Sequence, residues 1–247
     1  MPPLTDARQG DVDRRRRRTP AHVWRRGREI VRDEGWKRLL FVVLGDLGYR
    51  RFLLYERRLD EPILPVALRL PVVCEPFQPA AFEEYLRVHP LIPRAQLEER
   101  LARGDECYVA RTDGRIAAVT WLSRDAHFFR SIGCRYELPA GEVYFYDSFT
   151  DPCLRGQGIA PALGVWVLER LRASGVTRAV LAIVPENVAN RRARAKTGFR
   201  PFMRIDYVRV AGRRWHWHRT TDARRRTRGC HTRTPLPGRR DASIGDY

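Results

Sequence analysis

A short glycine-rich stretch between a run of strand-type residues and an apolar helical pattern limits the folds open to this chain. The stretch is Arg155-Gly156-Gln157-Gly158-Ile159-Ala160. It follows the aromatic run from Val143 to Phe149 and opens the apolar pattern from Ile159 to Leu171. Glycines at such a turn let main-chain N–H groups converge on an anion, and the helix N-terminus adds its positive end. The sequence therefore predicts a binding site for a phosphate-bearing cofactor.

Two common phosphate-binding motifs fit this turn poorly. The dinucleotide fingerprint G-x-G-x-x-G requires a third glycine where Pro161 stands. A Walker A loop requires Gly-Lys-Ser/Thr, but Lys196-Thr197 follows Ala195. There remains a short turn with an arginine at its entry, suited to a pyrophosphate held by the backbone. A tight strand-to-helix connection without any ligand is the alternative.

The charge of the chain raises the question of an anionic partner. The 247 residues are 43% apolar, enough for a core, and carry a net charge of +18. Residues 1–38 contribute +6 and residues 212–247 contribute +7, so most of the excess lies at the two ends. Only Lys37 and Lys196 are lysines, and an arginine excess throughout a chain is weak evidence for function. Nucleic acid bound through the basic ends is thus an alternative partner, but not the favoured one.

Cysteine usage and hydropathy indicate a cytoplasmic protein. The cysteines are odd in number, scattered and without a C-x-x-C pair, which predicts reduced thiols: Cys74, Cys107, Cys134, Cys153 and Cys230. The apolar run from Leu39 to Leu44 is too short to cross a membrane. His216 and His218, with Cys230 and His231, match no strong zinc spacing, so no metal is expected.

The chain divides into four segments. Residues 1–20 are polar and arginine-rich and are expected to be a disordered basic arm. Residues 21–70 are expected to be an N-terminal extension packed on the main domain, with a helix from His22 to Leu47 and a strand or helix from Arg51 to Leu59. Residues 71–211 form the main domain. Residues 212–247 read as a basic, disordered tail, although alternating tryptophans and histidines at 215–218 suit an edge strand.

Within the main domain, strands and helices alternate. Hairpin strands are expected at 106–111 and 115–123 around Asp113-Gly114, with further strands at 72–77, 142–150, 178–184 and 202–210. Helices are expected at 79–89, 93–103, 159–173 and 187–196, and residues 124–140 are expected to be a loop. This order predicts a mixed α/β sheet covered on both faces.

With these elements in place, the sequence resembles the GNAT acyltransferase superfamily. The family motif Arg/Gln-x-x-Gly-x-Gly/Ala is matched by Arg155, Gly158 and Ala160. An asparagine after the next strand is matched by Asn187, and a closing Gly-Phe pair by Gly198-Phe199. The resemblance covers about residues 70–210.

The resemblance implies a fold and a cofactor. The fold would be a mostly antiparallel central sheet with a splayed strand pair and helices on both faces, plus the N-terminal helical extension. The cofactor would be acetyl-CoA or another acyl-CoA, and the acceptor an amine. The coenzyme pyrophosphate would lie on the amides of Gly156, Gln157, Gly158, Ile159 and Ala160, with Arg155 adding charge. Its pantetheine arm would pair with backbone near Phe149 and Thr150 and be oriented by Asn187.

Acyl transfer to an amine also needs a proton acceptor. Glu142 lies thirteen residues before Arg155, an offset that the family sometimes uses, and it shares a strand phase with Tyr144 and Tyr146. Aromatic surroundings would raise the pKa of Glu142 and suit it to act as the base, whereas a solvated strand-start glutamate is the alternative. Asp147 is the rival base if a bulge reverses its phase.

The family also implies an acid for the departing thiolate, and here the sequence departs from it. Many members carry a tyrosine four residues before the closing glycine, where this chain has Arg194. An arginine cannot donate its proton at neutral pH, although it can stabilise a thiolate or a coenzyme phosphate. The acid would then be water, Tyr144 or Tyr146. Arg194 could also belong to a solvated basic helix face.

The leading function is therefore N-acyl transfer from acyl-CoA to a primary amine on a small molecule or peptide. The acceptor site would be built from the helices at 79–103 and from the 124–140 segment, whose candidates are Phe128, Phe129, Arg130, Arg135 and Tyr136. The alternative is a non-catalytic or RNA-associated protein that binds nucleic acid through its arginine-rich ends.

Overall fold

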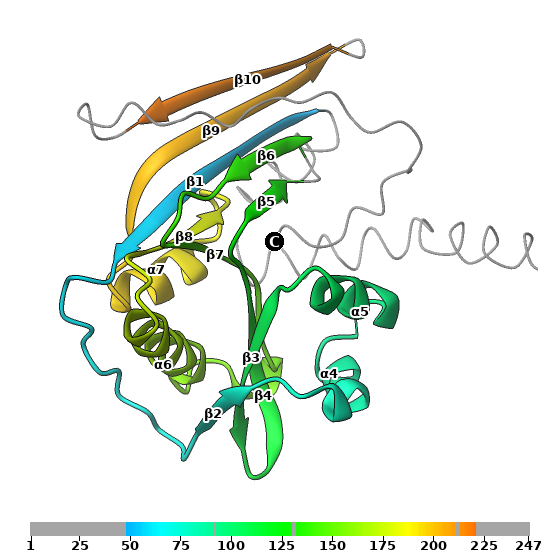
Figure 1. Cartoon of the computed structure of the whole chain (residues 1–247), viewed down its shortest axis with the longest axis vertical. Coiled ribbons are helices and arrows are strands. Elements are labelled where there is room, and N and C mark those ends of the chain that lie inside the picture. Colours follow the sequence, from blue (N-terminus) through cyan, green and yellow to red (C-terminus); the bar gives the residue numbers. More distant parts are fainter. Residues whose placement is uncertain (1–47, 91, 130–131, 211–212, 221–247) are drawn as a thin grey trace, which may run out of the picture.

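An eight-stranded mixed sheet forms the centre of the protein, in the order β10-β9-β1-β8-β7-β4-β3-β2 (Figure 1). The computed structural model describes residues 48–90, 92–129, 132–210 and 213–220. The strands of this sheet are β1 (Tyr49–Arg58), β2 (Val73–Pro76), β3 (Glu106–Thr112), β4 (Arg115–Ser123), β7 (Glu142–Thr150), β8 (Arg178–Ile183), β9 (Arg200–Val210) and β10 (Arg213–Thr220). Strands β5 (Ala126–Phe129) and β6 (Cys134–Glu137) pair separately.

The helices lie on both faces of the sheet, as Figure 1 shows. They are α4 (Phe82–Val88), α5 (Arg94–Ala102), α6 (Ile159–Ala173) and α7 (Val188–Lys196), with short 3-10 turns η1 (Pro79–Ala81) and η2 (Pro152–Leu154). On one face, Leu163, Val167 and Leu171 of α6 recur at helical spacing and pack on the sheet. The predicted mixed sheet with helices on both faces is confirmed.

The opposite face carries two further apolar clusters. Tyr85 of α4 and Leu97 of α5 pack beneath β3 and β4 with Trp121. The β5–β6 hairpin covers the neighbouring part of the sheet, where Phe129 packs against Tyr144. Tyr146 touches both clusters, so helices and hairpin share this face.

One strand pair has the splay that the family resemblance implies. Strands β7 and β8 are the parallel pair in the described sheet, and they pair only from Glu142–Arg178 to Phe145–Leu181. Beyond Phe145, β7 continues to Thr150 along β4 alone, while β8 ends at Ile183. The β8-facing edge of β7 therefore has no strand partner in the described chain from Tyr146 onward.

A β-bulge interrupts β7 at the start of this unpaired part. Trp121 of β4 faces Tyr146 and Val119 faces Phe149, so two residues of β7 stand opposite Thr120. Asp147, one of the two, has a φ of 45°. A left-handed conformation at a bulge turns the following side chains and increases the local twist. From the sequence, Asp147 could lie on the opposite face of the strand only if the strand contained a bulge, and this bulge is present.

The structure corrects two of the element expectations and resolves a third. Residues 124–140, expected as a loop, contain the β5–β6 hairpin, because four pairs such as Phe128–Arg135 close around a turn at Gly133. Residues 213–220 form the edge strand β10, which corrects the expectation of a disordered tail there and confirms the edge strand suggested at 215–218. The segment from 51 to 59 belongs to β1, which lies inside the sheet between β8 and β9. The expected helix at 22–47, the arm at 1–20 and the tail from 221 lie outside the described residues.

Two further expectations concern cysteines and the membrane. Cys74, Cys107 and Cys153 are free, but Cys134 is disulfide-bonded, contrary to the expectation of reduced thiols. Spacing along a sequence does not show which thiols meet in space, which explains the error. Among the described residues, no helix is long and apolar enough to cross a membrane.

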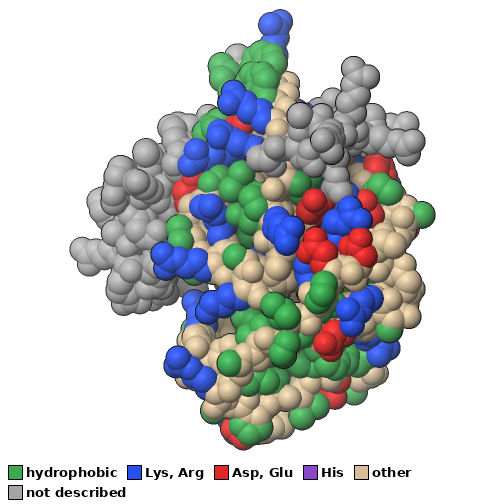
Figure 2. All heavy atoms as spheres, turned by 90° about the vertical axis from the view of Figure 1, so that its left-hand side faces the viewer, with side chains coloured by type: hydrophobic (Ala, Val, Ile, Leu, Met, Phe, Trp, Pro, Cys, Tyr) green, Lys and Arg blue, Asp and Glu red, His purple; other side chains and the backbone are tan. Residues whose placement is uncertain are grey.

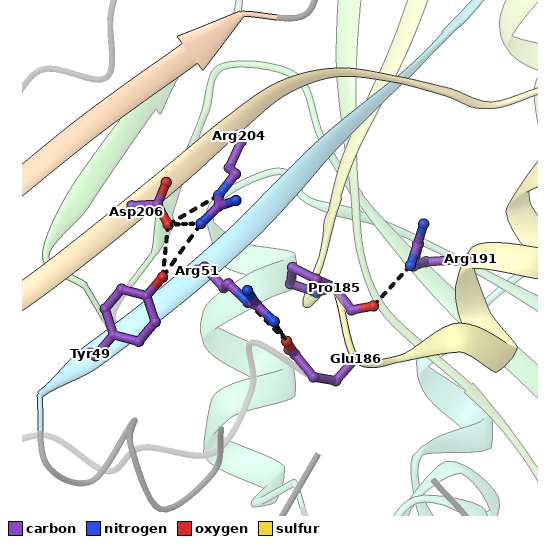
Figure 3. A network of polar contacts seen from close by, with 7 residues as sticks. All are labelled: Tyr49, Arg51, Pro185, Glu186, Arg191, Arg204 and Asp206. Atoms are coloured by element: carbon purple, nitrogen blue, oxygen red, sulfur yellow. Dashed lines mark hydrogen bonds and ion pairs between the residues drawn. The ribbon is translucent and has the colours of Figure 1, made fainter. Parts of the chain in front are cut away.

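Polar contacts tie the turn after β8 to the strands beside it (Figure 3). Arg51 of β1 pairs with Glu186 in that turn, whose side chain is only 6% exposed. Asp206 of β9 accepts hydrogen bonds from Tyr49 at 3.0 Å and from Nε of Arg204 at 3.0 Å. The Arg51–Glu186 pair joins the turn before α7 to β1, and the contacts of Asp206 join β1 to β9.

Two glycines that follow helices give a matched test of packing around the sheet. Gly175 and Gly198 both have positive φ, of 82° and 79°, so alanine at either costs about 1–2 kcal/mol. A Cβ at Gly175 would meet nothing within 4 Å, whereas at Gly198 it would lie 2.9 Å from Cζ of Arg57. Arg57 is 5% exposed and donates to Glu61 at 2.6 Å.

We therefore expect Gly198→Ala to lower the free energy of unfolding by about 1–3 kcal/mol more than Gly175→Ala does. Urea denaturation of the two variants and the wild type measures the difference. Equal losses would show that Arg57 is not held tightly against Gly198.

Candidate functional site

The mouth of α6 presents a row of main-chain donors without acceptors. The amides of residues 156–160 make no hydrogen bond within the described chain. Gly158 is the N-cap, with a φ of 86° and no side chain to cap the helix. Unpaired amides at a helix N-terminus carry a partial positive charge and bind anions. This arrangement fits the pyrophosphate of a coenzyme.

The space around the two glycines of the turn differs. A Cβ at Gly156 would meet nothing within 4 Å, so that side of the turn is open. A Cβ at Gly158 would lie 2.6 Å from the carbonyl oxygen of Ala67. The amide of Arg69 also donates to the carbonyl of Gln157 at 3.3 Å. The connection from β1 to β2 therefore runs along one side of the turn and leaves the other side free.

Arg155, Phe149 and Thr150 meet where β7 ends. The guanidinium of Arg155 lies 5.9 Å from the ring centroid of Phe149, and its Nε donates to the carbonyl of Thr150 at 3.4 Å. The ring of Phe149 stacks on His89 at 4.3 Å between centroids. The structure thus brings three of the predicted coenzyme residues together beside the turn at residues 156–158, which is called the open turn below.

Arg194 and Ser148 face each other across the gap between β7 and α7. Nη2 of Arg194 donates to Oγ of Ser148 at 2.6 Å, and this oxygen lies 2.8 Å from Oγ1 of Thr120. The guanidinium lies 5.8 Å from the ring centroids of both Phe145 and Phe199. Burial lowers the pKa of Arg194 to about 10, so the group is still a cation at neutral pH. The gap therefore holds one positive charge beside a hydroxyl.

Asp147 is held at the bulge by two partners from the helical face. Its side chain is 6% exposed; one carboxylate oxygen pairs with Nη1 of Arg100 and the other lies 3.2 Å from Nε2 of His89. Burial alone would raise the pKa of Asp147, but the hydrogen bond from His89 and the charge of Arg100 outweigh it and hold the pKa below its ordinary value. Asp147 is thus a carboxylate that clamps the bulge.

Glu142 lies at the other end of β7. Its Oε1 accepts from Nη1 of Arg178 at 2.7 Å, and the remaining oxygen is buried without a partner in the described chain. Eight residues of extended strand separate it from Thr150, or roughly 25 Å. A surface hollow of about 480 Å³ beside it is lined by Arg178, Thr177 and neighbouring residues. The geometry therefore does not bring Glu142 to the mouth of α6.

The two tyrosines predicted beside Glu142 have separate surroundings. Tyr144 is 2% exposed and stacks on His127 of the hairpin at 4.1 Å. Tyr146 donates to Oδ2 of Asp105 at 2.8 Å and lies beneath the Arg100 guanidinium. Burial raises the pKa of the Tyr146 hydroxyl well above its usual value. Tyr146 therefore contacts Arg100, the partner of Asp147, whereas Tyr144 packs under the hairpin.

Asn187 begins α7. Its side-chain oxygen accepts from the amide of Asn190 at 3.0 Å, which caps the helix. This contact explains the residue without a ligand, and a role in orienting the coenzyme remains a proposal. Among the described residues, no group of three or more His, Cys, Asp or Glu side chains could hold a metal ion.

Sequence reasoning missed His89 and Arg100 as parts of this site. Arg100 is 3% exposed and lies three residues after Leu97, so it occupies the apolar face of α5. A charged side chain on an apolar helix face needs a buried partner. The position of Arg100 on that face could therefore have indicated from the sequence that it has a buried acidic partner. His89 follows the end of α4 and carried no comparable signal.

The clamp on Asp147 gives a stability test. Asp147→Asn would leave Arg100 buried without a counter-charge, so we expect the free energy of unfolding to fall by about 3–5 kcal/mol at neutral pH. Since the folded pKa of Asp147 is depressed, its contribution is present above about pH 4 and is lost as the pH falls further. Denaturation curves of wild type and variant from neutral to acid pH should therefore converge.

A surface pair provides the control. Glu98 and Arg94 are about half exposed and lie 3.0 Å apart, so Glu98→Gln should cost less than about 1 kcal/mol. If Asp147→Asn behaved like Glu98→Gln at every pH, the buried pair would not hold the bulge.

Comparison with known proteins gives a family-model match that covers more than half of the chain. A family model described as the acetyltransferase (GNAT) family matches residues 72–199, which is more than half of the chain. A search of curated proteins gives no match. Among solved structures, a GNAT-family protein from Novosphingobium aromaticivorans is similar with a TM-score of 0.47 and 18% identity, over 64% of this chain and 62% of that one.

Two other solved structures are similar at the same level. The ribosomal-protein-S18-alanine N-acetyltransferase from Escherichia coli has a TM-score of 0.43 and 13% identity, over 53% of this chain and 78% of its own. A GNAT-family acetyltransferase from Colwellia psychrerythraea has a TM-score of 0.46 and 15% identity, over 62% and 53%. With TM-scores below 0.5, these likenesses carry no part of the assignment.

The match to the family model carries the assignment. Its span runs from the residue before β2 to the Gly198-Phe199 pair, and it includes the open turn, the bulge and Arg194. The chain belongs to the acetyltransferase (GNAT) family.

Proposed function

We propose that the protein is an N-acyltransferase that moves an acetyl or other acyl group from acyl-CoA to a primary amine by direct attack. The observation that carries the proposal is the row of five acceptor-free amides at residues 156–160. A diphosphate is the coenzyme group that would use several convergent amides at once. A cytoplasmic location, where acyl-CoA is at hand, is part of the proposal.

The unpaired edge of β7 supports the same coenzyme. Past Phe145, the β8-facing main-chain groups of β7 have no strand partner in the described chain. The amide-bearing pantetheine arm could pair with such an edge as an added strand does. We propose that the arm runs from the open turn along Thr150 and Phe149 toward Ser148, with Asn187 helping to orient it.

The chain's own residues then position the reaction. The amine nitrogen attacks the thioester carbonyl carbon, the C–S bond breaks, and the amine proton passes to water. Holding the two reactants together supplies much of the reduction in barrier. A main-chain N–H on the unpaired edge of β7 is the proposed donor to the developing oxyanion. Asp147 acts as a positioning residue, because Arg100 and His89 hold it at the bulge that sets the path of the strand.

The acceptor approaches from the face that carries α4, α5 and the β5–β6 hairpin. Phe128 in the hairpin is 49% exposed, and Arg135 beside it is half exposed and paired with Glu137. Of the other predicted acceptor residues, Phe129 and Tyr136 are buried beneath the hairpin and Arg130 lies outside the described residues. The acceptor is proposed to be an amine on a small molecule or a peptide.

Ligand-dependent melting tests the proposal. Acetyl-CoA should stabilise the protein by about 2.7 kcal/mol at a concentration a hundred times its Kd, because it binds only the folded chain. Release of free thiol from acetyl-CoA in a panel of amines reports the reaction. A protein that melts at the same temperature with acetyl-CoA, CoA and longer acyl-CoAs would contradict the proposal.

The open turn gives a sharper test through Gln157→Glu. The change keeps the shape of the side chain but adds a negative charge where the coenzyme phosphates are proposed to lie. We expect the affinity for acetyl-CoA to fall at least about tenfold, while the free protein gains up to about 1 kcal/mol because an anion suits a helix N-terminus. Calorimetric titration and melting measure the two effects separately.

Gln78→Glu is the matched control, since Gln78 is exposed and precedes η1. It adds the same charge elsewhere and should leave acetyl-CoA affinity within about twofold of wild type, because a distant exposed charge is screened. Equal losses in the two variants would mean that net charge, and not the open turn, governs binding.

Nucleic-acid binding is the second candidate function, and one observation favours it. Trp215 and Trp217 on β10 are 42% and 50% exposed and alternate in the same phase as Arg213 and Arg219. Exposed rings beside guanidinium groups can stack on unpaired bases. Figure 2 shows a feature that argues against nucleic-acid binding on the α6 side. There the basic side chains do not form one continuous patch but are spread among acidic and apolar ones.

A double variant separates the two functions. Trp215→Ala with Trp217→Ala should leave the stabilisation by acetyl-CoA unchanged, because β10 lies at the far edge of the sheet from β7. If RNA is the partner, stabilisation by single-stranded RNA should occur in the wild type, weaken steeply with salt and be lost in the variant. Melting with each ligand at two salt concentrations measures both.

A further inference from the structure

Arg194 differs from three other arginines that contact the sheet, because it has no carboxylate partner in the described chain. Arg57, Arg100 and Arg178 each pair with a carboxylate, at Glu61, Asp147 and Glu142 respectively. Arg194 has no carboxylate partner among the described residues; its contacts are a hydroxyl and two phenyl rings. A guanidinium that lacks a counter-ion favours any anion that enters its site. The charge is therefore placed for a ligand.

The position of Arg194 indicates which part of a ligand it would meet. Its Nη1 lies 3.8 Å from a Cβ built on Gly164, five residues into α6. At 1.5 Å per residue, this point is roughly 8 Å along the helix from the open turn. Its partner Ser148 lies on the part of β7 that β8 has left, and Ser148 is exposed. Arg194 is thus well inside the gap, away from the amides at the turn.

We infer that Arg194 accepts the negative charge of the coenzyme thiolate as it leaves, in place of an acid that would protonate it. The inference rests on the proposed function. When the C–S bond breaks, its electron pair goes to sulfur, which forms an ion pair with the guanidinium. The amine proton goes to water, so Arg194 gains and loses no proton.

The electrostatics of the site agree with this role. Dehydration lowers the pKa of Arg194 to about 10, yet the group remains charged throughout the neutral range. A guanidinium in contact with a thiol lowers the pKa of that thiol, because it stabilises the thiolate. Phe145 and Phe199 exclude water from two sides of the guanidinium, which strengthens its attraction for an anion.

The test compares CoA with desulfo-CoA, which lacks the sulfur, in the wild-type protein. A free thiol titrates near pH 8.5, so a lowered pKa in the complex makes CoA bind more tightly as the pH rises from about 6.5 to about 9.5. We expect the ratio of the two affinities to change in favour of CoA by at least about fivefold over this range. Calorimetric titration at several pH values measures it without any turnover.

Two variants assign the effect to Arg194. Arg194→Gln keeps a donor for Ser148 but removes the charge, so the change in the ratio should disappear while desulfo-CoA affinity stays within about twofold of wild type. Arg194→Lys keeps a charge and should retain at least part of the effect. Turnover with acetyl-CoA should fall at least about tenfold in Arg194→Gln and less in Arg194→Lys.

The outcomes separate this inference from the function on which it rests. If neither CoA nor desulfo-CoA binds the wild type, the proposed function fails. If both bind with the same pH dependence, coenzyme binding stands and the role of Arg194 is wrong. Equal losses of affinity for the two ligands in Arg194→Gln would also overturn it, since Arg194 would then hold another part of the coenzyme.

Discussion

The ion pair between Asp147 and Arg100 is the contact on which the arrangement of the site depends. It ties the bulge in β7 to α5, and His89 at the end of α4 adds a second tie. With the bulge fixed, β7 follows β4 while β8 ends, and the gap between the strands remains open. Burying such an ion pair is costly because both charges lose their water. Breaking it is also costly, because removing either partner leaves an unpaired charge in the interior. The strand is thereby held in a path that it would not take as a regular ladder.

Arginine serves three different purposes along this chain. In the interior it forms carboxylate pairs that join elements, as Arg178 does between Glu142 on β7 and Glu56 on β1. On the surface it forms weaker pairs such as Arg94 with Glu98. Near the proposed coenzyme site, Arg155 and Arg194 have no carboxylate partner in the described chain and remain free to meet a ligand's charge. The excess of arginine is thus informative only once the partners are known.

The turn and the helix after it could be predicted from sequence because both are local. Positive φ at glycine and apolar residues three and four apart are properties of neighbours, and the observed α6 has the expected bounds. Asp147 could not be placed in the same way. Its partners are 47 and 58 residues away, so only tertiary packing brings them together.

Phase along a strand was one reason to prefer Glu142 as the base, and it says little about the neighbours of that side chain. The shared phase of Glu142, Tyr144 and Tyr146 is consistent with their packing on one face, but it carries no information about which neighbour each residue meets. Arg178 on the paired strand neutralises the glutamate, whereas Tyr146 meets Arg100 and Asp105. The 124–140 hairpin was missed for a related reason, since its strands are short and pair only with each other.

The two glycines of the open turn carry different information for anyone reading related sequences. Gly158 abuts the carbonyl of Ala67, so any protein with this β1–β2 connection needs a glycine there whether or not it binds a coenzyme. Gly156 faces empty space, and the protein itself offers no steric objection to a side chain pointing there. Under the proposed function, a related protein that no longer bound the coenzyme could therefore lose Gly156 at a modest conformational cost but would keep Gly158. Gly156, and not Gly158, would then be the better marker of the proposed coenzyme binding.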